Sequence, residues 1–405
     1  MKPPIRLLLI TTAWTFALLT ASSFLSAWFW DLGAGLLSIL QFYAVLFATM
    51  LLGFALAWKY ALPVESSRLM VAGIGLNVCF LALLLVLRGA VGGDYLLLAV
   101  LEGASAAAYW LALYVLAAVW IRPAEAGWYN GWTGTLEAAM GLVIPPLSGW
   151  TIAAMRGLEG YQVVFATALI SLLGCLWLIL GGVHPVAPPA AAKTRATRAV
   201  ALPAARPLLW SFWGLGLRDG VYFFLPNLLL FIITRNALLL GAFVAAEAAA
   251  QGALFGLLTH RSDGKTRSAS LITATLGSLA ALAMLWVPLT PATLFALGIL
   301  VSLAYPPFKV ALESSALAAI SVSSRHEDDR VRLTGLKEAW INGGRLTSLL
   351  GLVLVTISAR GVPVGGFRDI LALCGLVPLF IYAAYHRYRP APQRFPSSAS
   401  PASTR

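Results

Sequence analysis

Two charged residues, Arg218 and Asp219, stand near the middle of an apolar stretch that covers residues 210–234. The stretch is longer than the roughly 20 residues that a helix needs to cross a bilayer. A charge at such a depth costs at least about 2.5–3.5 kcal/mol to insert, which makes these side chains candidates for a functional site. Because adjacent residues of a helix point in different directions, we expect Arg218 and Asp219 to find partners on different neighbouring helices. The alternative is a structural ion pair that holds helices together.

Further charged residues fall inside other apolar stretches, and the acidic ones outnumber the basic ones. A buried carboxyl without a countercharge favours its protonated form until water or a cation reaches it, so such a group can carry a proton. We predict proton-coupling groups in the order Glu247, Glu102 and Asp219, with Glu247 first because its alanine-rich stretch holds no basic residue. The alternative is that the surplus acids bind a cationic substrate directly. The bases in these stretches are Arg218, Lys309 and Arg345, and the other acids are Glu137 and Glu313.

Helical spacing predicts local pairs among these residues. Lys309 and Glu313 are four residues apart, which places them on one helix face, and we expect them to pair as a gate or as a structural bridge. Arg345 shares one side of its stretch with Asn342 and Glu338, where a local Glu338–Arg345 link is the structural alternative.

Other candidates are chosen by depth. Glu137 lies in the inner half of its stretch and is a candidate for an inner gate. Three deep tyrosines, Tyr109, Tyr222 and Tyr305, are candidates for the lining of an apolar cavity. The predicted cavity or gate residues are Arg218, Tyr222, Glu137, Tyr305, Lys309, Glu313, Asn342 and Arg345.

The composition is that of a polytopic helical membrane protein. Of the 405 residues, 60% are hydrophobic and 11% charged, with a mean hydropathy of +0.84, whereas soluble domains carry about 25% charged residues. The net charge of +12 falls in loops and tails, so membrane topology explains it better than nucleic-acid binding, and we expect no nucleic-acid partner. The three cysteines and four histidines show no metal or disulfide spacing. Catalytic serine, zinc and phosphate-loop motifs are also absent, so we expect no metal, no cofactor and no enzymatic activity.

Apolar stretches predict twelve spans in two sets of six. We assign residues 1–183 to an N-terminal six-helix bundle and residues 207–388 to a C-terminal one. A Pro- and Ala-rich linker at 184–206 joins them, and residues 389–405 form a disordered tail. The predicted spans are 7–30, 36–58, 69–87, 95–121, 128–155, 161–183, 207–234, 237–258, 268–287, 292–320, 338–358 and 369–385.

Basic residues are distributed unevenly between the two sides of this map. The side opposite the termini holds few of them, and most others, Lys337 included, fall on the side that both termini share. The positive-inside rule therefore predicts that both termini are cytoplasmic. The basic residues on the opposite side are Arg88, Arg156, Arg235, Arg360 and Arg368.

The two six-span halves and their loops resemble the major facilitator superfamily. The loop at 256–267 is similar to the cytoplasmic motif of that superfamily, with His260 where the motif has an aspartate, and the loop after the second span keeps Gly53, Lys59 and Arg68. The resemblance covers residues 5–388. It implies an all-α membrane protein of twelve transmembrane helices in two six-helix halves, with substrate bound near the midplane between the halves.

Two proline pairs lie within predicted spans. Residues 141–149 resemble a Gly/Pro motif associated with exporters, although Pro145 replaces one of its glycines. Pro145 and Pro146 remove two backbone donors and predict a bend in span five, and Pro306 and Pro307 predict one in span ten. Such bends suit a transporter that rocks, and a purely structural kink is the alternative.

A narrower resemblance links residues 129–134, 218–220 and 336–345 to a poorly characterised branch of bacterial permeases. We expect a secondary active transporter that works by alternating access, and specifically a proton-coupled exporter of hydrophobic or amphiphilic small molecules. Its expected partners are that substrate, protons and membrane lipids, and it is expected to be a monomer in the bacterial plasma membrane. The alternatives are a lipid or lysolipid translocator of the same fold and a non-transporting membrane receptor or scaffold.

Overall fold

The computed structural model describes residues 2–60, 65–87, 95–155, 157–181, 202–258, 264–288, 290–323, 327–358 and 364–388. Helices are the regular secondary structure of these ranges. Long apolar segments form helices because a bilayer offers no partners for backbone N–H and C=O groups, which must then be satisfied within the segment. Parts of the predicted map lie outside the described residues, namely His260, most of the 184–206 linker and the 389–405 tail.

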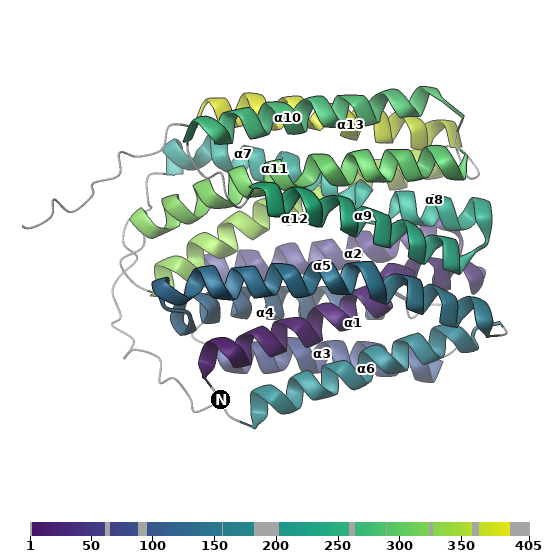
Figure 1. Cartoon of the computed structure of the whole chain (residues 1–405), viewed down its shortest axis with the longest axis horizontal. Coiled ribbons are helices and arrows are strands. Elements are labelled where there is room, and N and C mark those ends of the chain that lie inside the picture. The colour runs from purple at the N-terminus through teal and green to yellow at the C-terminus, as the bar shows by residue number, and fades with distance from the viewer. Residues whose placement is uncertain are drawn as a thin grey trace, which may run out of the picture.

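The first six helices pack together as one half of the molecule (Figure 1). They alternate in direction and are joined by short connections. Their bounds are α1 (Pro3–Asp31), α2 (Leu36–Tyr60), α3 (Ser66–Leu87), α4 (Tyr95–Trp120), α5 (Pro123–Ala154) and α6 (Glu159–Leu180).

The remaining helices form the second half, which lies above the first in Figure 1. One short 3-10 turn, η1 (Met284–Trp286), follows α10. The bounds of the α-helices are α7 (Leu202–Tyr222), α8 (Leu225–Thr234), α9 (Ala237–Leu258), α10 (Gly264–Ala283), α11 (Pro291–Ser323), α12 (Glu327–Ser358) and α13 (Val364–His386).

The number of spans agrees with the prediction. Among the described residues, 11 helices are long and apolar enough to cross a membrane, and Leu271–Trp286 is a shorter apolar helix at the place of the ninth predicted span. The all-α membrane class with two six-helix halves is therefore confirmed.

Span seven is broken, which the sequence-based map did not predict. Residues 205–234 read as one apolar segment, but α7 ends at Tyr222 and α8 begins at Leu225. Pro226 lies in the first turn of α8 and has no N–H to donate to the carbonyl of Tyr222, so a continuous helix would lose that bond. Span eleven also differs, because α12 begins at Glu327, well before the apolar stretch at 338.

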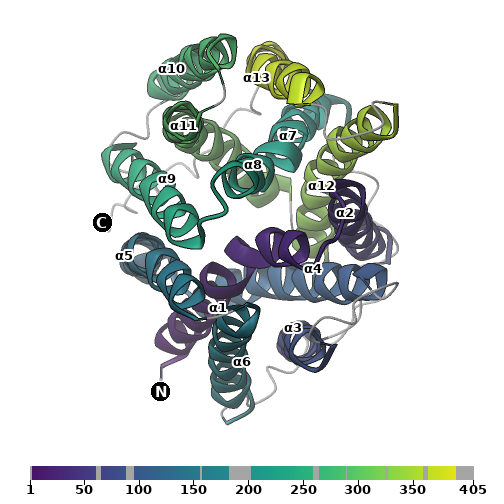
Figure 2. The same ribbon diagram turned by 90° about the vertical axis from the view of Figure 1, so that its right-hand side faces the viewer.

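The two halves meet along two helix pairs, α2 with α12 and α5 with α9 (Figure 2). At the right-hand end of Figure 1, which we call the α8 end, α1 and α8 also touch near the centre of the bundle. The α5–α9 contact is close, because a Cβ on Gly241 would collide with the carbonyl oxygen of Pro145. Both proline pairs lie inside continuous helices, α5 and α11. The bends expected at these pairs remain a prediction.

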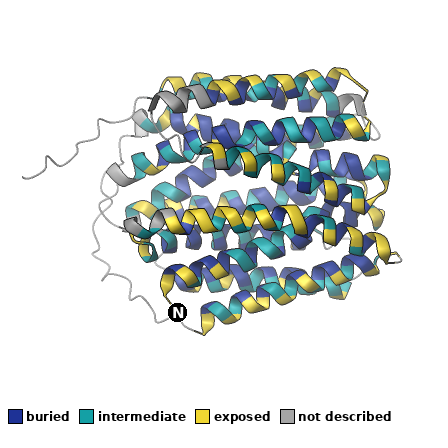
Figure 3. Ribbon diagram, viewed as in Figure 1, coloured by how far each residue is buried: buried dark blue, intermediate teal, exposed yellow. Residues whose placement is uncertain are grey.

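Burial follows the pattern of a membrane bundle (Figure 3). Large apolar side chains such as Ile170, Trp177, Leu317 and Leu354 are exposed on the periphery, where lipid tails can cover them. Several charged and amide side chains are buried between helices instead. The interior therefore holds the chemically distinctive groups of the molecule.

Candidate functional site

The central charged residues are positioned by a glycine-mediated contact between α7 and α12. A Cβ on Gly216 would collide with the carbonyl oxygen of Ile341, and a Cβ on Gly344 would collide with that of Trp213. Only glycine allows two helix backbones to approach this closely. The contact places the middle of α7 directly beside the middle of α12.

Arg218, Asp219 and Arg345 form an ion network at this contact. Arg218 Nη1 lies 3.2 Å from Asp219 Oδ1, and Arg345 Nη2 lies 3.7 Å from Asp219 Oδ2. Arg218 is only 4% exposed and donates from Nη2 to the carbonyl oxygen of Val301 on α11 at 2.7 Å. The prediction that Arg218 and Asp219 have partners on different neighbouring helices is confirmed, because Arg218 contacts α11 and Asp219 contacts Arg345 of α12. The long Arg218 side chain also reaches the carboxylate of Asp219, which the prediction did not include.

Aromatic rings enclose the network. The Arg218 guanidinium lies 5.4 Å from the ring centres of both Tyr222 and Tyr305, a distance at which cation–π attraction acts. The Tyr222 hydroxyl donates to the carbonyl oxygen of Leu371 at 3.0 Å and so fixes its ring. Arg345 lies 5.3 Å from the ring of Phe47 on α2, so the network contacts the opposite half of the molecule.

Glu247 on α9 approaches the same network without forming an ion pair within the described residues. Its carboxylate lies against Gly298 of α11, and it interacts electrostatically with Arg218 beyond ion-pair distance. One turn away, Gln251 Nε2 lies 3.4 Å from Ser302 Oγ. The structure therefore brings the first proton-coupling candidate next to Arg218.

Lys309 and Glu137 are exposed although both occur within long spans. Lys309 interacts electrostatically with Glu137 and Glu313, and its ammonium lies 5.6 Å from the Tyr305 ring. Since Glu137 is on α5 and Lys309 on α11, this interaction links the two halves of the molecule. Glu137 of the N-terminal half therefore lies within electrostatic reach of Lys309 in the C-terminal half.

Glu313 pairs with Lys337 and not with Lys309, so that predicted pair was wrong. Lys337 Nζ lies 2.8 Å from Glu313 Oε2 and 2.9 Å from Glu338 Oε1, and the residue is only 5% exposed. Rings of Tyr114 on α4 and Phe212 on α7 lie 5.0 Å and 5.6 Å from the ammonium. The prediction missed Lys337 because it treated this lysine as a loop residue on the cytoplasmic side. The earlier start of α12 places it about 15 Å along the helix.

The predicted Glu338–Arg345 link is also replaced by other contacts. Glu338 pairs with Lys337, while Arg345 Nη1 donates to Asn342 Oδ1 at 3.3 Å. Asn342 is fully buried and its Nδ2 donates to the Glu338 carbonyl oxygen at 2.9 Å. Asn342 therefore orients Arg345 toward Asp219.

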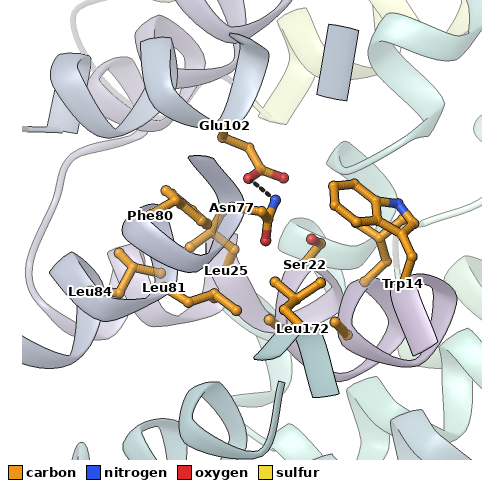
Figure 4. A pocket seen from close by; sticks show the side chains of 12 residues that line it. Trp14, Ser22, Leu25, Asn77, Phe80, Leu81, Leu84, Glu102 and Leu172 are labelled. Atoms are coloured by element: carbon orange, nitrogen blue, oxygen red, sulfur yellow. Dashed lines mark hydrogen bonds between the residues drawn. The ribbon is translucent and has the colours of Figure 1, made fainter. Parts of the chain in front are cut away.

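Glu102 lies apart from these residues, inside the N-terminal half (Figure 4). It is 7% exposed and accepts a hydrogen bond from Asn77 Nδ2 on α3 at 2.7 Å. Ser105, one turn further along α4, donates to the carbonyl oxygen of Gly73 at 2.9 Å. The site candidates therefore divide into a central C-terminal network and a separate N-terminal carboxyl.

At the α8 end, an ion pair joins the halves. Arg235 Nη1, after α8, lies 3.6 Å from Asp31 Oδ1, at the end of α1. Tyr161 of α6 donates to the other carboxylate oxygen of Asp31 at 2.8 Å, and the Trp30 ring lies 5.4 Å from the Arg235 guanidinium. These contacts connect the ends of α1 and α8 and the start of α6. Sequence analysis counted Arg235 as an outer loop charge and did not single out its partner.

The fold and these interior charges define a class of molecule: a multi-pass membrane protein with the major facilitator fold. In the described part of the chain, no three histidine, cysteine or acidic side chains come together as metal ligands.

Solved structures of transporters share this fold. A bacterial homologue of the iron transporter ferroportin in the outward-facing state, with soaked iron, superposes with a TM-score of 0.67 and 13% identity over 96% of this chain and 99% of that one. The peptide transporter POT in complex with sulfate gives 0.68 and 12%, over 95% of this chain and 94% of that one. The nucleoside transporter NupG gives 0.65 and 10%, over 96% of this chain and all (100%) of that one. At such identities, the comparisons establish the fold.

Sequence comparison finds relatives among bacilli. The chain is similar to the uncharacterized protein YqgE of Bacillus subtilis (strain 168), at 22% identity over 381 residues, which cover 93% of this chain and 87% of that protein. It is also similar to an uncharacterized protein in the sodM 3' region of Geobacillus stearothermophilus, at 33% identity over 128 residues, which cover 31% of this chain and 58% of that protein. No family model matches the sequence.

Proposed function

We propose that this protein is a secondary active transporter that works by alternating access and exports hydrophobic or amphiphilic small molecules in exchange for protons. The observation that carries the proposal is the Arg218–Asp219–Arg345 network in the middle of the spans, in which Arg218 is buried and its two partners are half-buried. The network also touches Phe47 of the opposite half. Charges at this depth are costly to insert, and a scaffold gains nothing from them. A transporter uses them to bind substrate and to change partners as the halves move.

Glu247 is the proposed proton carrier. It lies close to Arg218 but forms no ion pair in the described part of the chain. With the site closed, the low dielectric favours its neutral form, and access to water allows ionisation. Alternating access supplies that change of environment to each side of the membrane in turn, so movement of substrate is linked to movement of a proton.

The aromatic surroundings support an amphiphilic substrate. Tyr222 and Tyr305 present ring surface beside Arg218, and Lys309 and Glu137, which belong to opposite halves, are exposed and interact electrostatically. A substrate with an apolar body and a polar end fits such a lining, because rings bury the body while the charges hold the end.

The proposed setting is the bacterial plasma membrane, with both termini cytoplasmic and the protein monomeric. Positions at the ends of helices provide labelling sites that test this orientation. On a cysteine-free background, Gly157→Cys should react with an impermeant maleimide from outside, and Ser66→Cys only after the membrane is opened. Reaction of both from the same side contradicts the map.

Transport is tested in proteoliposomes with an imposed pH gradient. The probes are ethidium, Hoechst 33342 and an NBD-labelled lysophospholipid, compared with protein-free liposomes. We expect the gradient to drive dye accumulation, and Glu247→Gln to abolish accumulation while dye exchange without a gradient persists. Glu125→Gln is the matched control, because this partly exposed carboxyl pairs with Arg122 at the start of α5.

Each contrary result rejects a defined part of the proposal. Accumulation that ignores the pH gradient, or that survives Glu247→Gln, rejects proton coupling through this residue. Movement of the labelled lysolipid without movement of the dyes favours the lipid translocator. Movement of none of the probes, in protein that inserts and remains monodisperse, favours a receptor or scaffold.

A further inference from the structure

The break in span seven leaves two phenylalanines, Phe223 and Phe224, between α7 and α8. Phe224 is buried, and its ring stacks on that of Tyr43 of α2 with 4.4 Å between the ring centres. Phe223 is 56% exposed, although it lies within the apolar segment that covers residues 205–234. One ring therefore fastens the break to the N-terminal half, and the neighbouring ring stays largely uncovered.

The ring of Phe223 packs on two aromatic residues of the opposite half. Its centre lies 6.3 Å from the ring centres of both Tyr43 and Phe47 on α2, and both pairs have edge-to-face geometry. Tyr43 and Phe47 are buried in the bundle. The packing partners of Phe223 are thus interior residues, and in this respect it differs from Trp177, whose ring is exposed on the periphery.

Phe223 also stands one helical turn beyond the central ion network. Its N–H donates to the carbonyl oxygen of Asp219 at 3.0 Å, and residues four positions apart share one face of a helix. The ring of Phe47, which Phe223 contacts, lies 5.3 Å from the guanidinium of Arg345. The exposed ring is therefore connected to the network through the end of α7 and through a side chain of the opposite half.

We propose that Phe223, supported by Phe47, forms an aromatic subsite that binds a planar aromatic ring of the substrate. Aromatic rings pack on one another in offset-stacked or edge-to-face arrangements, and such a pair is stabilised beyond the area that it buries. The uncovered surface of Phe223 offers this packing beside the charges that hold the polar end of the substrate. The subsite rests on the proposed transport function, and it narrows the substrate class to amphiphiles that carry an aromatic ring.

Equilibrium binding to the purified full-length protein in nanodiscs tests the subsite without any transport assay, with empty nanodiscs as the blank. The probes are ethidium, a planar aromatic cation, and tetrabutylammonium, an apolar cation of the same charge without a ring. Phe223→Leu removes the ring and keeps an apolar side chain, whereas Phe223→Trp keeps a ring. We expect Phe223→Leu to weaken ethidium binding about threefold to tenfold and to leave tetrabutylammonium binding unchanged. Phe223→Trp should bind ethidium as the unmodified protein does, and so should Trp177→Leu, which removes an exposed ring at the periphery.

Thiol accessibility tests where the uncovered surface of Phe223 lies. On a cysteine-free background, a charged methanethiosulfonate in the aqueous phase should modify Phe223→Cys, and bound ethidium should slow that reaction. Trp177→Cys is the matched control and should stay unmodified, because lipid tails cover that part of the periphery.

Four results overturn the proposal. Unchanged ethidium binding in Phe223→Leu rejects the subsite, and the transport proposal stands if the unmodified protein still accumulates the dye. Equal losses of ethidium and tetrabutylammonium binding in Phe223→Leu identify a general apolar contact that has no preference for rings. A Phe223→Cys thiol that reacts only with a lipid-soluble reagent places this side chain against lipid. Unmodified protein that binds neither probe rejects the proposed substrate class, and the subsite with it.

Discussion

Neutral replacement of Arg218 and Asp219, singly and together, separates a transport role from a structural one. Arg218→Met leaves a side chain of similar length, and Asp219→Asn keeps the shape and one hydrogen-bond acceptor for Arg345. In the single Arg218→Met variant, a half-buried carboxylate loses its nearest base. In the double variant, neither charge of that pair remains.

The distances give the size of the expected effects. At an effective dielectric of about 20, the attraction is about 5 kcal/mol at the 3.2 Å of Arg218–Asp219 and about 4.5 kcal/mol at the 3.7 Å of Arg345–Asp219. Desolvation offsets much of this, and removal of one partner of a buried pair costs roughly 3–5 kcal/mol. Because Asp219 keeps Arg345, we expect Arg218→Met to cost about 3 kcal/mol. The double variant should recover at least about 1 kcal/mol of that loss.

Thermal unfolding in detergent measures stability, and dye accumulation in proteoliposomes measures transport. If the pair only holds α7 in place, the double variant recovers both quantities. If the charges act in transport, the double variant recovers stability while accumulation stays at the level of empty liposomes. A double variant that accumulates dye at the unmodified rate refutes the functional role.

Three further changes test the surrounding architecture. Gly216→Ala should lower stability by about 1–3 kcal/mol, because its Cβ meets a backbone carbonyl of α12; Gly131→Ala, where the added Cβ meets open space, is the control in the same unfolding assay. Lys337→Met should cost about 3–5 kcal/mol, because two carboxylates then face each other unpaired; a loss below about 1 kcal/mol contradicts a buried bridge. Arg235→Ala breaks a partly exposed pair and should change stability by less than about 1 kcal/mol. The same change should speed maleimide labelling of Phe224→Cys from the α8 end. An unchanged labelling rate shows that this pair does not restrict access at that end.

The fold was predictable because each span carries its own signal. Uninterrupted apolar stretches specify helices in a bilayer regardless of their neighbours, so twelve spans could be counted along the chain. The break after Tyr222 depends on a single local feature, Pro226, inside a stretch whose hydropathy is uniform. The first turns of α12, from Glu327 to the apolar stretch at 338, consist largely of polar residues. A search for apolar stretches does not detect such turns.

The choice of ion partners was less predictable, because partners belong to different helices. Spacing along one helix favoured Lys309 for Glu313, but packing of α11 against α12 brings Lys337 within 2.8 Å of that carboxylate. Helical geometry alone gave no contact between Arg218 and Asp219, because adjacent positions of a helix point in different directions. The arginine side chain is long enough to reach the neighbouring carboxylate in spite of that angle. Pair geometry of this kind depends on tertiary packing and on side-chain reach.

The corrected pairing still leaves some acids without a base. Lys337 brings one positive charge into the interior and Glu338 one negative charge, and both belong to the cluster around Glu313. Asp219 is held by two arginines. The excess of acids over bases that the sequence predicted therefore does not depend on the wrong pairs.

Among the described interior residues, Glu102 and Glu247 are buried or half-buried carboxyls without an ion pair, and each half of the molecule contains one of them. Their surroundings differ. Glu247 lies near Arg218 and the central network, whereas Glu102 lies against an apolar wall inside the N-terminal half. Neutral replacement separates the two carboxyls. Glu247→Gln should abolish dye accumulation driven by a pH gradient, because it removes the ionisable group near Arg218, whereas Glu102→Gln should leave most of that accumulation. Loss of accumulation in Glu102→Gln together with its retention in Glu247→Gln would reverse this assignment of the proton carrier.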